Sequence, residues 1–384
     1  MAQLARSADA LELACREQRL AFGIEPSRGN LRDWIGNPLF DRTLQRLKDA
    51  LRLCYDVLKL ALGRGERLDH CFERLVEYQG KLERLLQTEQ PGAAYWFDTT
   101  RIHFSFNVTP LSIADRFNSE VMRAGCSWVF TSATLAVGRD FGHYCRELGL
   151  NWVEPPIDTA VWGSPFDYPK QAMLYAPQNM PDPNAPDYPD AVARVAFPLI
   201  RAARGRTFVL CTSLRSMRRI HEIIADKLEA EKLELPLLIQ GEGSRSELLE
   251  RFRKLGNAIL VASQSFWEGV DVPGDALSVV VIDKLPFAPP DDPVLAARID
   301  NMQKEGRSPF MEYQLPRAVI NVKQGAGRLI RTERDRGVLA ICDPRMLTKP
   351  YGRRVWQSLP PMTRSKVEAE VVAFLEQLPP PAAG

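Results

Sequence analysis

The sequence predicts an α/β protein in which a helical segment precedes a domain built on a parallel sheet. Short runs rich in Val, Ile and Leu occur at residues 207–211, 237–240, 258–262, 278–282 and 338–342, with amphipathic segments between them. Strands that lack polar alternation are buried on both faces, as in parallel sheets covered by helices. Ahead of this region, apolar residues recur at helical spacing. These two observations set the fold class.

The helical segment contains two apolar stripes, one on each side of a glycine turn at residues 63–65. This pattern predicts an antiparallel helical hairpin, and a plain helical bundle fits the spacing as well. The stripes consist of Phe40, Leu44, Leu47, Leu51, Cys54 and Leu58, and of Leu68, Phe72, Leu75, Leu82 and Leu86.

Hydroxyl side chains follow a strand that we expect at residues 127–130. Ser132 and Thr134 would lie at the carboxyl end of this strand, where ligands bind in α/β sheets. A helix N-cap is an equally good interpretation of Ser132. The same part of the chain predicts strands at residues 95–97 and 103–106 and a helix at residues 111–122.

The second half of the chain continues the alternation. A proline-rich connection should contain one strand, Ala172–Tyr175. Helices are expected near residues 214–228 and 246–255, and Ser244 with Glu247 has the pattern of a capping box for the second helix. An amphipathic helix over residues 367–378 closes the domain.

The most informative stretch is Gln-Gly-Ala-Gly-Arg-Leu-Ile-Arg at residues 324–331. If it is helical, Gln324, Arg328 and Arg331 share the polar face, and the two arginines form a cationic fork suited to phosphate. An Arg-x-x-Arg pair alone is more often a solvated basic surface. Glycines inside a helical run need a reason, so the whole pattern favours the phosphate site.

This stretch resembles motif VI of superfamily 2 helicases. Residues 265–271 (Ser-Phe-Trp-Glu-Gly-Val-Asp) resemble motif V of the DinG/XPD branch, residues 131–135 resemble motif III, and residues 208–213 resemble motif IV. The motifs occur in the family's order, and the resemblance covers nearly the whole chain. It extends to shorter elements at residues 164–168, 239–241 and 283–287, which are typical of bacterial DinG and YoaA-type proteins.

Two elements of the family are missing from the sequence. It has neither the Gly-Lys-Thr/Ser phosphate loop nor the Asp-Glu-Ala-His box. The seven cysteines have no Cys-x-x-Cys pair, so we expect no metal ligands here; the family often ligates a 4Fe–4S cluster in its first motor domain. The chain therefore resembles a C-terminal portion that lacks roughly the first half, whether by nature or by design.

The resemblance implies three parts. Residues 1–92 would be the arch-like helical segment, and residues 93–155 the tail of the first RecA-like motor domain with motif III. Residues 156–384 would be a complete second RecA-like domain of the P-loop-NTPase type. ATP and Mg²⁺ would bind between the two motor domains, with the phosphate loop and the magnesium ligands supplied by the first.

The resemblance also assigns roles to residues. Arg328 and Arg331 are candidate arginine fingers, and Gln324 would bridge to the nucleotide or to the motif III hydroxyls. Candidates for single-stranded DNA contacts gather in motifs IV and V, although a solvated helix face fits Arg215 and Arg218 equally well. The coupling candidates are Ser132, Thr134, Glu268, Gly269 and Asp271, and the DNA candidates are Thr212, Ser213, Arg215, Arg218, Gln264 and Ser265.

The expected function is ATP-driven 5′-to-3′ movement on single-stranded DNA during repair or replication, in the bacterial cytoplasm and with a replication or repair protein as a further partner. A net charge of +2 gives no overall attraction to nucleic acid, so the DNA surface must be local. No apolar run suggests a membrane partner. The alternative is a non-catalytic module that binds single-stranded DNA or a repair partner. A Rossmann-type enzyme is disfavoured, since no Gly-x-Gly-x-x-Gly follows a first strand.

Overall fold

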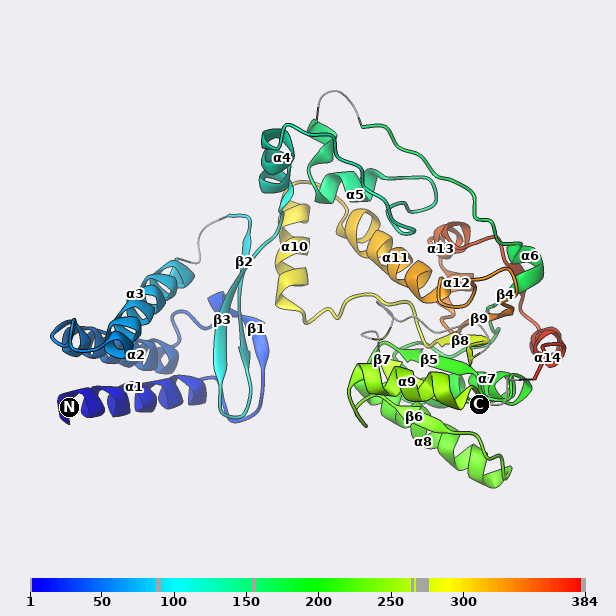
Figure 1. Cartoon of the computed structure of the whole chain (residues 1–384), viewed down its shortest axis with the longest axis horizontal. Helices are drawn as coiled ribbons and strands as arrows, with labels where there is room; N and C mark the ends of the chain where they lie inside the picture. Colours follow the sequence, from blue (N-terminus) through cyan, green and yellow to red (C-terminus); the bar gives the residue numbers. More distant parts are fainter. Residues whose placement is uncertain (1, 88–90, 154–156, 264–265, 267–275, 381–384) are drawn as a thin grey trace. The chain divides into compact units, whose positions relative to one another are not determined.

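The computed structural model describes residues 2–87, 91–153, 157–263, 266 and 276–380. The chain forms two compact units that interleave in sequence (Figure 1). The first unit comprises Met1–Arg123, Glu147–Gly149 and Ala288–Pro309, and the second comprises Ala124–Arg146, Leu150–Phe287 and Phe310–Gly384.

Helices dominate the start of the first unit. The two predicted helices are confirmed as α2 (Pro38–Lys59) and α3 (Glu66–Leu86), and α1 (Ala2–Leu20) packs against α2. Asn37 caps α2, because its side chain accepts hydrogen bonds from the first free amides of the helix. The apolar stripes of α2 and α3 meet in a small core around Leu47, Leu51, Cys54, Leu58 and Leu75.

A three-stranded antiparallel sheet completes this unit. The two predicted strands are confirmed as β2 (Ala93–Thr99) and β3 (Phe104–Pro110), and β1 (Arg28–Asn30) pairs with the other edge of β2. One face of the sheet packs on an aromatic cluster that includes Phe22, Phe40 and Phe97. The remaining helices of this unit are α4 (Ala114–Arg123) and α10 (Pro293–Lys304), of which α10 packs against β2.

Spatial grouping divides the expected tail of the first motor domain. Residues 93–123 belong to the same unit as the helices before them, whereas residues 124–146 belong to the second unit. The prediction of a strand at residues 127–130 is wrong, since this segment pairs with no strand in the part of the chain that the structure describes. A strand forms only where a neighbour accepts its backbone hydrogen bonds. Here Trp128 and Val129 are instead exposed.

The second unit is built on a seven-stranded sheet in the order β10-β4-β9-β8-β5-β7-β6, in which every neighbouring pair is parallel. The predicted α/β class and its parallel sheet are thereby confirmed. The edge strand β10 was not predicted, because three residues carry too little pattern. The strands are β4 (Ala172–Tyr175), β5 (Thr207–Cys211), β6 (Leu237–Ile239), β7 (Ile259–Ser263), β8 (Val279–Ile282), β9 (Gly337–Ile341) and β10 (Thr363–Ser365).

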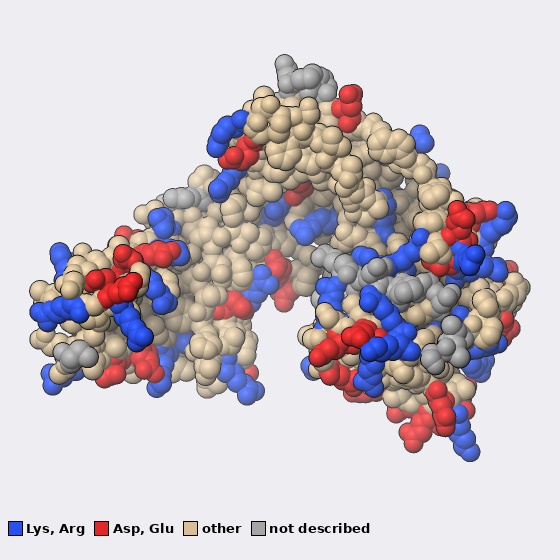
Figure 2. Space-filling model, in the orientation of Figure 1, with Lys and Arg blue, Asp and Glu red and all other residues tan. Residues whose placement is uncertain are grey.

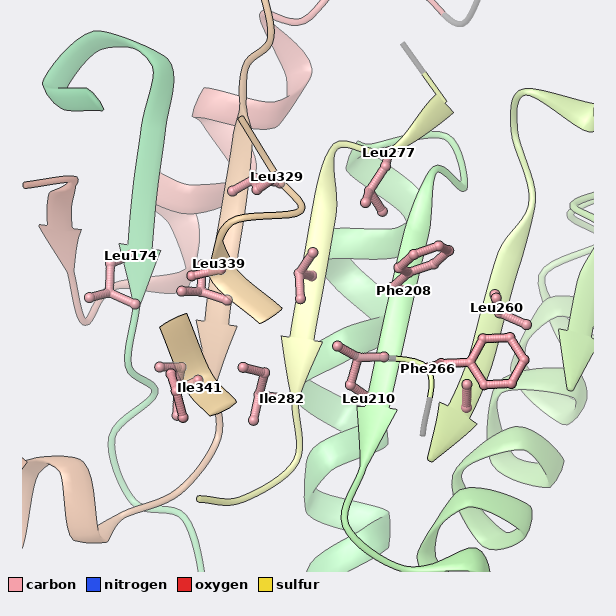
Figure 3. Packing of buried hydrophobic residues seen from close by; sticks show 14 of the residues in the cluster. Leu174, Phe208, Leu210, Leu260, Phe266, Leu277, Ile282, Leu329, Leu339 and Ile341 are labelled. Atoms are coloured by element: carbon pink, nitrogen blue, oxygen red, sulfur yellow. The ribbon is translucent and has the colours of Figure 1, made fainter. Parts of the chain in front are cut away.

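Helices cover both faces of this sheet. On one face α9 and α11 pack into a core that includes Phe208, Phe252 and Val319. Figure 3 shows part of this core, with Phe208 and Leu210 on one strand and Ile282 on its neighbour. On the other face α7, α8 and α14 pack into a core that includes Val209 and Ile220. The helices are α5 (Gly142–Glu147), α6 (Tyr168–Gln171), α7 (Tyr188–Ala202), α8 (Leu214–Ala230), α9 (Arg245–Leu255), α11 (Leu315–Ala326), α12 (Arg345–Thr348), α13 (Gly352–Ser358) and α14 (Glu368–Glu376).

Local capping signals set the ends of several helices. The capping box predicted for α9 is confirmed: the Ser244 hydroxyl accepts a hydrogen bond from the Glu247 amide at 3.3 Å, and the Glu247 carboxylate accepts one from the Ser244 amide at 2.8 Å. At the far end, Gly256 has φ of 66°, a left-handed cap that glycine adopts without strain. Within the described residues, no helix is long and apolar enough to cross a membrane.

Candidate nucleotide and nucleic-acid site

The carboxyl edge of the parallel sheet gathers polar side chains from three neighbouring strands. Thr212 and Ser213 follow β5, Asp283 follows β8, and Asp343 follows β9 after Cys342. Ligands of open α/β sheets bind at this edge. The residues sit here because the strands before them are continuous apolar runs that end at polar positions.

Asp283 is the centre of this group. Its carboxylate is fully buried and accepts hydrogen bonds from the Thr212 amide at 3.0 and 3.1 Å, from the Thr212 hydroxyl at 3.3 Å and from the Lys284 amide at 2.6 Å. Burial raises the pKa of Asp283 to about 7, and the hydrogen bonds from Thr212 and Lys284 act against this rise. Asp283 therefore cross-links the ends of β5 and β8.

Asp343 performs a similar task one strand away. Its carboxylate accepts a hydrogen bond from the Leu285 amide at 2.7 Å and forms an ion pair with Arg345 at 2.6 Å. The Tyr188 hydroxyl, which comes from α7, donates to the Asp283 carbonyl at 2.6 Å. These contacts hold the loops after β8 and β9 in one arrangement.

The candidate DNA contacts in motif IV lie together at the start of α8. Ser213 is the N-cap of this helix, and its side chain accepts a hydrogen bond from the Ser216 amide at 3.1 Å. Arg215 and Arg218 are exposed on α8 and form no ion pair with any described residue, whereas the neighbouring Arg219 pairs with Asp190 at 2.8 Å. Arg215 and Arg218 can thus reach a ligand without breaking an internal ion pair.

The motif VI arginines lie on a loop, so their predicted place on a helix face is wrong. Helix α11 ends at Ala326 with Gly327 as its cap. After the helix the chain tightens, with the Arg328 and Leu329 amides donating to the carbonyls of Gly325 and Ala326, and the Arg331 amide donates to the Asp335 carboxylate at 2.7 Å. Leu329 and Ile330 are buried between the two arginines, and Figure 3 shows Leu329 within the core.

The electrostatics of this loop still favour an anion. Arg328 and Arg331 are half-buried, and burial is the main cause that lowers the pKa of each guanidinium. Arg245 lowers the pKa of Arg328 further, whereas for Arg331 the carboxylate of Asp335 raises the pKa and Arg253 lowers it. Lys and Arg side chains gather over the side of the second unit that carries α9, interspersed with acidic ones (Figure 2).

Gln171 and Asp335 hold the loop in place. The buried Gln171 side chain donates to the carbonyls of Thr332 and Asp335 at 2.9 and 3.0 Å. The Asp335 carboxylate also accepts from the Thr332 amide and hydroxyl at 2.9 and 2.7 Å. The segment that directly follows the motif VI arginines is therefore anchored to the rest of the unit.

Motif VI also contacts the chain just after motif III. The Lys323 ammonium donates to the Ala136 carbonyl at 2.9 Å, and burial lowers the pKa of Lys323. Next to it, the buried Oε1 atom of Gln324 has no hydrogen-bond partner among the described residues. Ser132 and Thr134 bond to each other, at 3.3 Å between their hydroxyl oxygens. A ligand that donates to Gln324 would satisfy the orphaned acceptor.

The motif V candidates Gln264, Ser265, Glu268, Gly269 and Asp271 lie outside the described residues. Among the described residues, no group of three or more His, Cys, Asp or Glu side chains could hold a metal ion. Reasoning from the sequence missed Asp283, Lys323 and Asp335 as parts of the site. Asp283 had a signal, since it opens the family-typical stretch 283–287, but Lys323 and Asp335 had none.

Comparisons with known proteins agree with this fold. Residues 197–362 match the model of the helicase C-terminal domain. The chain is 47% identical over 373 residues to the ATP-dependent DNA helicase YoaA of Escherichia coli K12, an alignment that covers 97% of this chain and 57% of the relative. The chain belongs to the family of the DinG and YoaA helicases and matches their C-terminal portion.

Two further matches extend the comparison. The ATP-dependent helicase DinG of Mycobacterium tuberculosis is 38% identical over 273 residues, which are 71% of this chain and 40% of the relative. A solved structure described as an XPD helicase has a TM-score of 0.53 at 16% identity, covering 96% of this chain and 62% of that one, and it supports the fold alone. The chain thus spans little more than half the length of the E. coli helicase.

Proposed function

We propose that this chain is the C-terminal portion of an ATP-dependent DNA helicase that couples ATP hydrolysis to 5′-to-3′ movement along single-stranded DNA in repair or replication. One observation carries the proposal. The candidate DNA contacts and the candidate nucleotide contacts come from opposite faces of the parallel sheet, because α8 packs on one face and α9 and α11 pack on the other. A motor needs separate sites for ATP and for DNA on one rigid domain. The nucleotide state can then change the affinity for DNA without the two ligands competing for the same residues.

At the nucleotide site, Arg328 and Arg331 would neutralise charge on the γ-phosphate, a role that can contribute on the order of 10³–10⁵ in rate. Asp335 supports this role by holding the Arg331 backbone. Gln324 would accept a hydrogen bond through its orphaned Oε1 atom. ATP would supply the phosphoryl group, and a first motor domain would supply the phosphate loop and the ligands for Mg²⁺. The hydrogen bond between Lys323 and the Ala136 carbonyl would transmit a movement of motif VI on ATP hydrolysis to the motif III hydroxyls of Ser132 and Thr134.

At the nucleic-acid site, Arg215 and Arg218 would neutralise phosphates of a single strand. Thr212 and Ser213 lie at the same end of α8. Gln264 and Ser265 of motif V are proposed to continue this track, and Glu268, Gly269 and Asp271 to couple it to the nucleotide. We place the protein in the bacterial cytoplasm, with a replication or repair protein as a further partner.

The first test asks whether the 384-residue chain turns over ATP by itself. We expect no phosphate release above background with or without single-stranded DNA, because the sequence contains no Gly-Lys-Thr/Ser phosphate loop. A fusion that adds the first motor domain of the E. coli helicase should restore DNA-stimulated turnover. ATP turnover by the chain alone would contradict the assignment of the phosphate loop and the magnesium ligands to a first motor domain. Tight DNA or partner binding with an inactive fusion would favour the non-catalytic module instead.

The second test separates ATP turnover from DNA binding in the same fusion. Arg331→Ala should lower ATP turnover by roughly 10³-fold or more and leave nucleotide-free DNA affinity nearly unchanged. Arg334→Ala is the matched control, since Arg334 is exposed on the same loop. If Arg331→Ala weakened DNA binding as strongly as turnover, the assignment of motif VI to ATP would be wrong.

Changing Arg215 and Arg218 together to Ala should have the reverse effect. The slope of log affinity against log salt should fall by about 0.7 for each phosphate that the protein no longer neutralises. The control changes two exposed cations of α7, Arg194 and Arg201, to Ala, which alters net charge equally. An unchanged slope for the α8 variant would remove this helix from the DNA track.

A further inference from the structure

The hydroxyl of Thr212, just before α8, has its one proton engaged within the protein. A Thr or Ser hydroxyl carries one proton and can donate one hydrogen bond. The Thr212 hydroxyl donates to the Asp283 carboxylate at 3.3 Å, and the Ser213 hydroxyl donates to the Ser216 hydroxyl at 2.9 Å. A phosphate oxygen is only an acceptor. Direct contact between the Thr212 hydroxyl and a phosphate would therefore require breaking the hydrogen bond to Asp283.

Asp283 is placed to act on this segment. Its amide donates to the Leu210 carbonyl at 3.0 Å, which extends the pairing of β8 with β5 by one residue. Its carboxylate accepts hydrogen bonds from both the amide and the hydroxyl of Thr212. Thr212 directly precedes Ser213, the N-cap of α8. The first turn of the helix, with Arg215, is thus tied to the central strands of the sheet through this carboxylate.

We propose that Asp283 is a positioning residue for DNA binding, and that Thr212 acts on DNA through this carboxylate instead of by touching a phosphate. The inference rests on the proposed function, since it concerns the DNA track at the start of α8. Asp283 is fully buried and cannot contact DNA itself. Its proposed role is to fix the position of the first turn of α8, and with it the position of Arg215 and Arg218.

Affinity for a fluorescein-labelled oligo(dT), measured by anisotropy with the 384-residue chain and no nucleotide, tests the idea. Asp283→Asn keeps one acceptor oxygen but loses the charge and the second acceptor. Thr212→Val keeps the shape and loses the hydroxyl. Each should weaken binding by about 3- to 10-fold, the worth of one or two hydrogen bonds. Thr212→Ser, which keeps the donor, should bind within about 2-fold of wild type.

A double-mutant cycle gives the decisive readout. If Thr212 acts through Asp283, the double variant Asp283→Asn/Thr212→Val should bind no more weakly than the weaker single variant. If the fold losses multiply, the Thr212 hydroxyl contacts DNA independently, and the proposal is overturned. Wild-type affinity for Asp283→Asn would overturn it too.

Two controls separate positioning from folding. Thr207→Val removes a buried hydroxyl at the opposite end of β5, which donates to the Gly205 carbonyl at 2.6 Å, and it should change affinity by less than about 2-fold. If Asp283→Asn does not fold, methylphosphonate substitution along the oligonucleotide decides. A direct contact would make the Thr212→Val loss vanish at one neutralised phosphate, whereas positioning leaves the loss in place at every phosphate.

The outcomes for the proposed function are distinct. If wild type fails to bind oligo(dT), or if the Arg215/Arg218 double change leaves affinity unaltered, the DNA track at α8 fails and this inference falls with it. If that double change weakens binding while Asp283→Asn does not, the track stands and only the positioning role of Asp283 is overturned.

Discussion

In the seven-stranded sheet, β5, β8 and β9 are buried along their whole length, whereas β3 of the three-stranded sheet exposes Ser105 and Val108 at its open edge. Helices cover both faces of the larger sheet, but the smaller one owes its core to an aromatic cluster on one face. When helices cover both faces of a sheet, the ends of its strands are the part that remains accessible to a ligand. In this protein those ends carry Thr212, Asp283 and Asp343.

The largest expected contrast lies in amide hydrogen exchange. Backbone amides of β5 and β7 should exchange only on unfolding of the whole unit, because these strands are paired on both sides. Amides of β3 and of residues 124–141 should exchange faster by about 10³-fold or more, through local opening. Exchange read by mass spectrometry at neutral pH checks this. Equal protection in the two sheets would mean that the smaller sheet opens only with the whole unit.

A matched pair of core truncations sharpens the same comparison. Phe208→Ala in β5 removes a side chain that is 2% exposed and packs on Phe252 at 4.6 Å between ring centres, and it should cost about 3–5 kcal/mol of unfolding free energy. Phe106→Ala in β3 removes a half-buried ring whose site can collapse, and it should cost about 1–2 kcal/mol. Urea unfolding of both variants gives the two values. The reverse order would contradict the ranking of the two cores.

The smallest effect concerns the strand-end carboxylate. Because the folded pKa of Asp283 is about 7 against an ordinary value of 3.8, the folded state binds the extra proton between these values. The contribution of Asp283 to stability is therefore greatest at acidic pH and falls as pH rises from about 4 to about 7. Between pH 5 and pH 7 the loss should be roughly 2 kcal/mol, since each pH unit is worth about 1.4 kcal/mol.

Asp283→Asn has no titrating group at this position. The unfolding free energy of wild type should therefore fall relative to that of the variant as the pH rises from 5 to 7. Burial raises the pKa of the neighbouring Tyr188, Cys211 and Cys342, so these groups stay neutral in the same range. Urea titrations of both proteins at pH 5 and pH 7 measure the effect. A difference that did not vary with pH would mean that Asp283 keeps one charge state throughout.

Much of the fold followed from local pattern. The alternation of apolar runs and amphipathic stretches placed β4, β5, β7 and β9 within a residue or two, because a strand buried on both faces leaves no polar position to mislead the assignment. The capping box at Ser244 and Glu247 set the start of α9, since its hydrogen bonds form within four neighbouring residues. The order of the helicase motifs indicated the family before any geometry was known.

Tertiary structure alone decided what depends on distant partners. Residues 127–130 have strand composition but lack a pairing neighbour among the described strands, and β1 and β10 become strands only because β2 and β4 pair with them. Arg331 lies beyond the end of α11 and donates its amide to the Asp335 carboxylate, and Lys323 reaches Ala136 across 187 positions of sequence. No periodicity encodes these contacts. Sequence determined which residue types stand at the strand ends, whereas folding determined which of their hydrogen bonds are already used within the protein and which remain for a ligand.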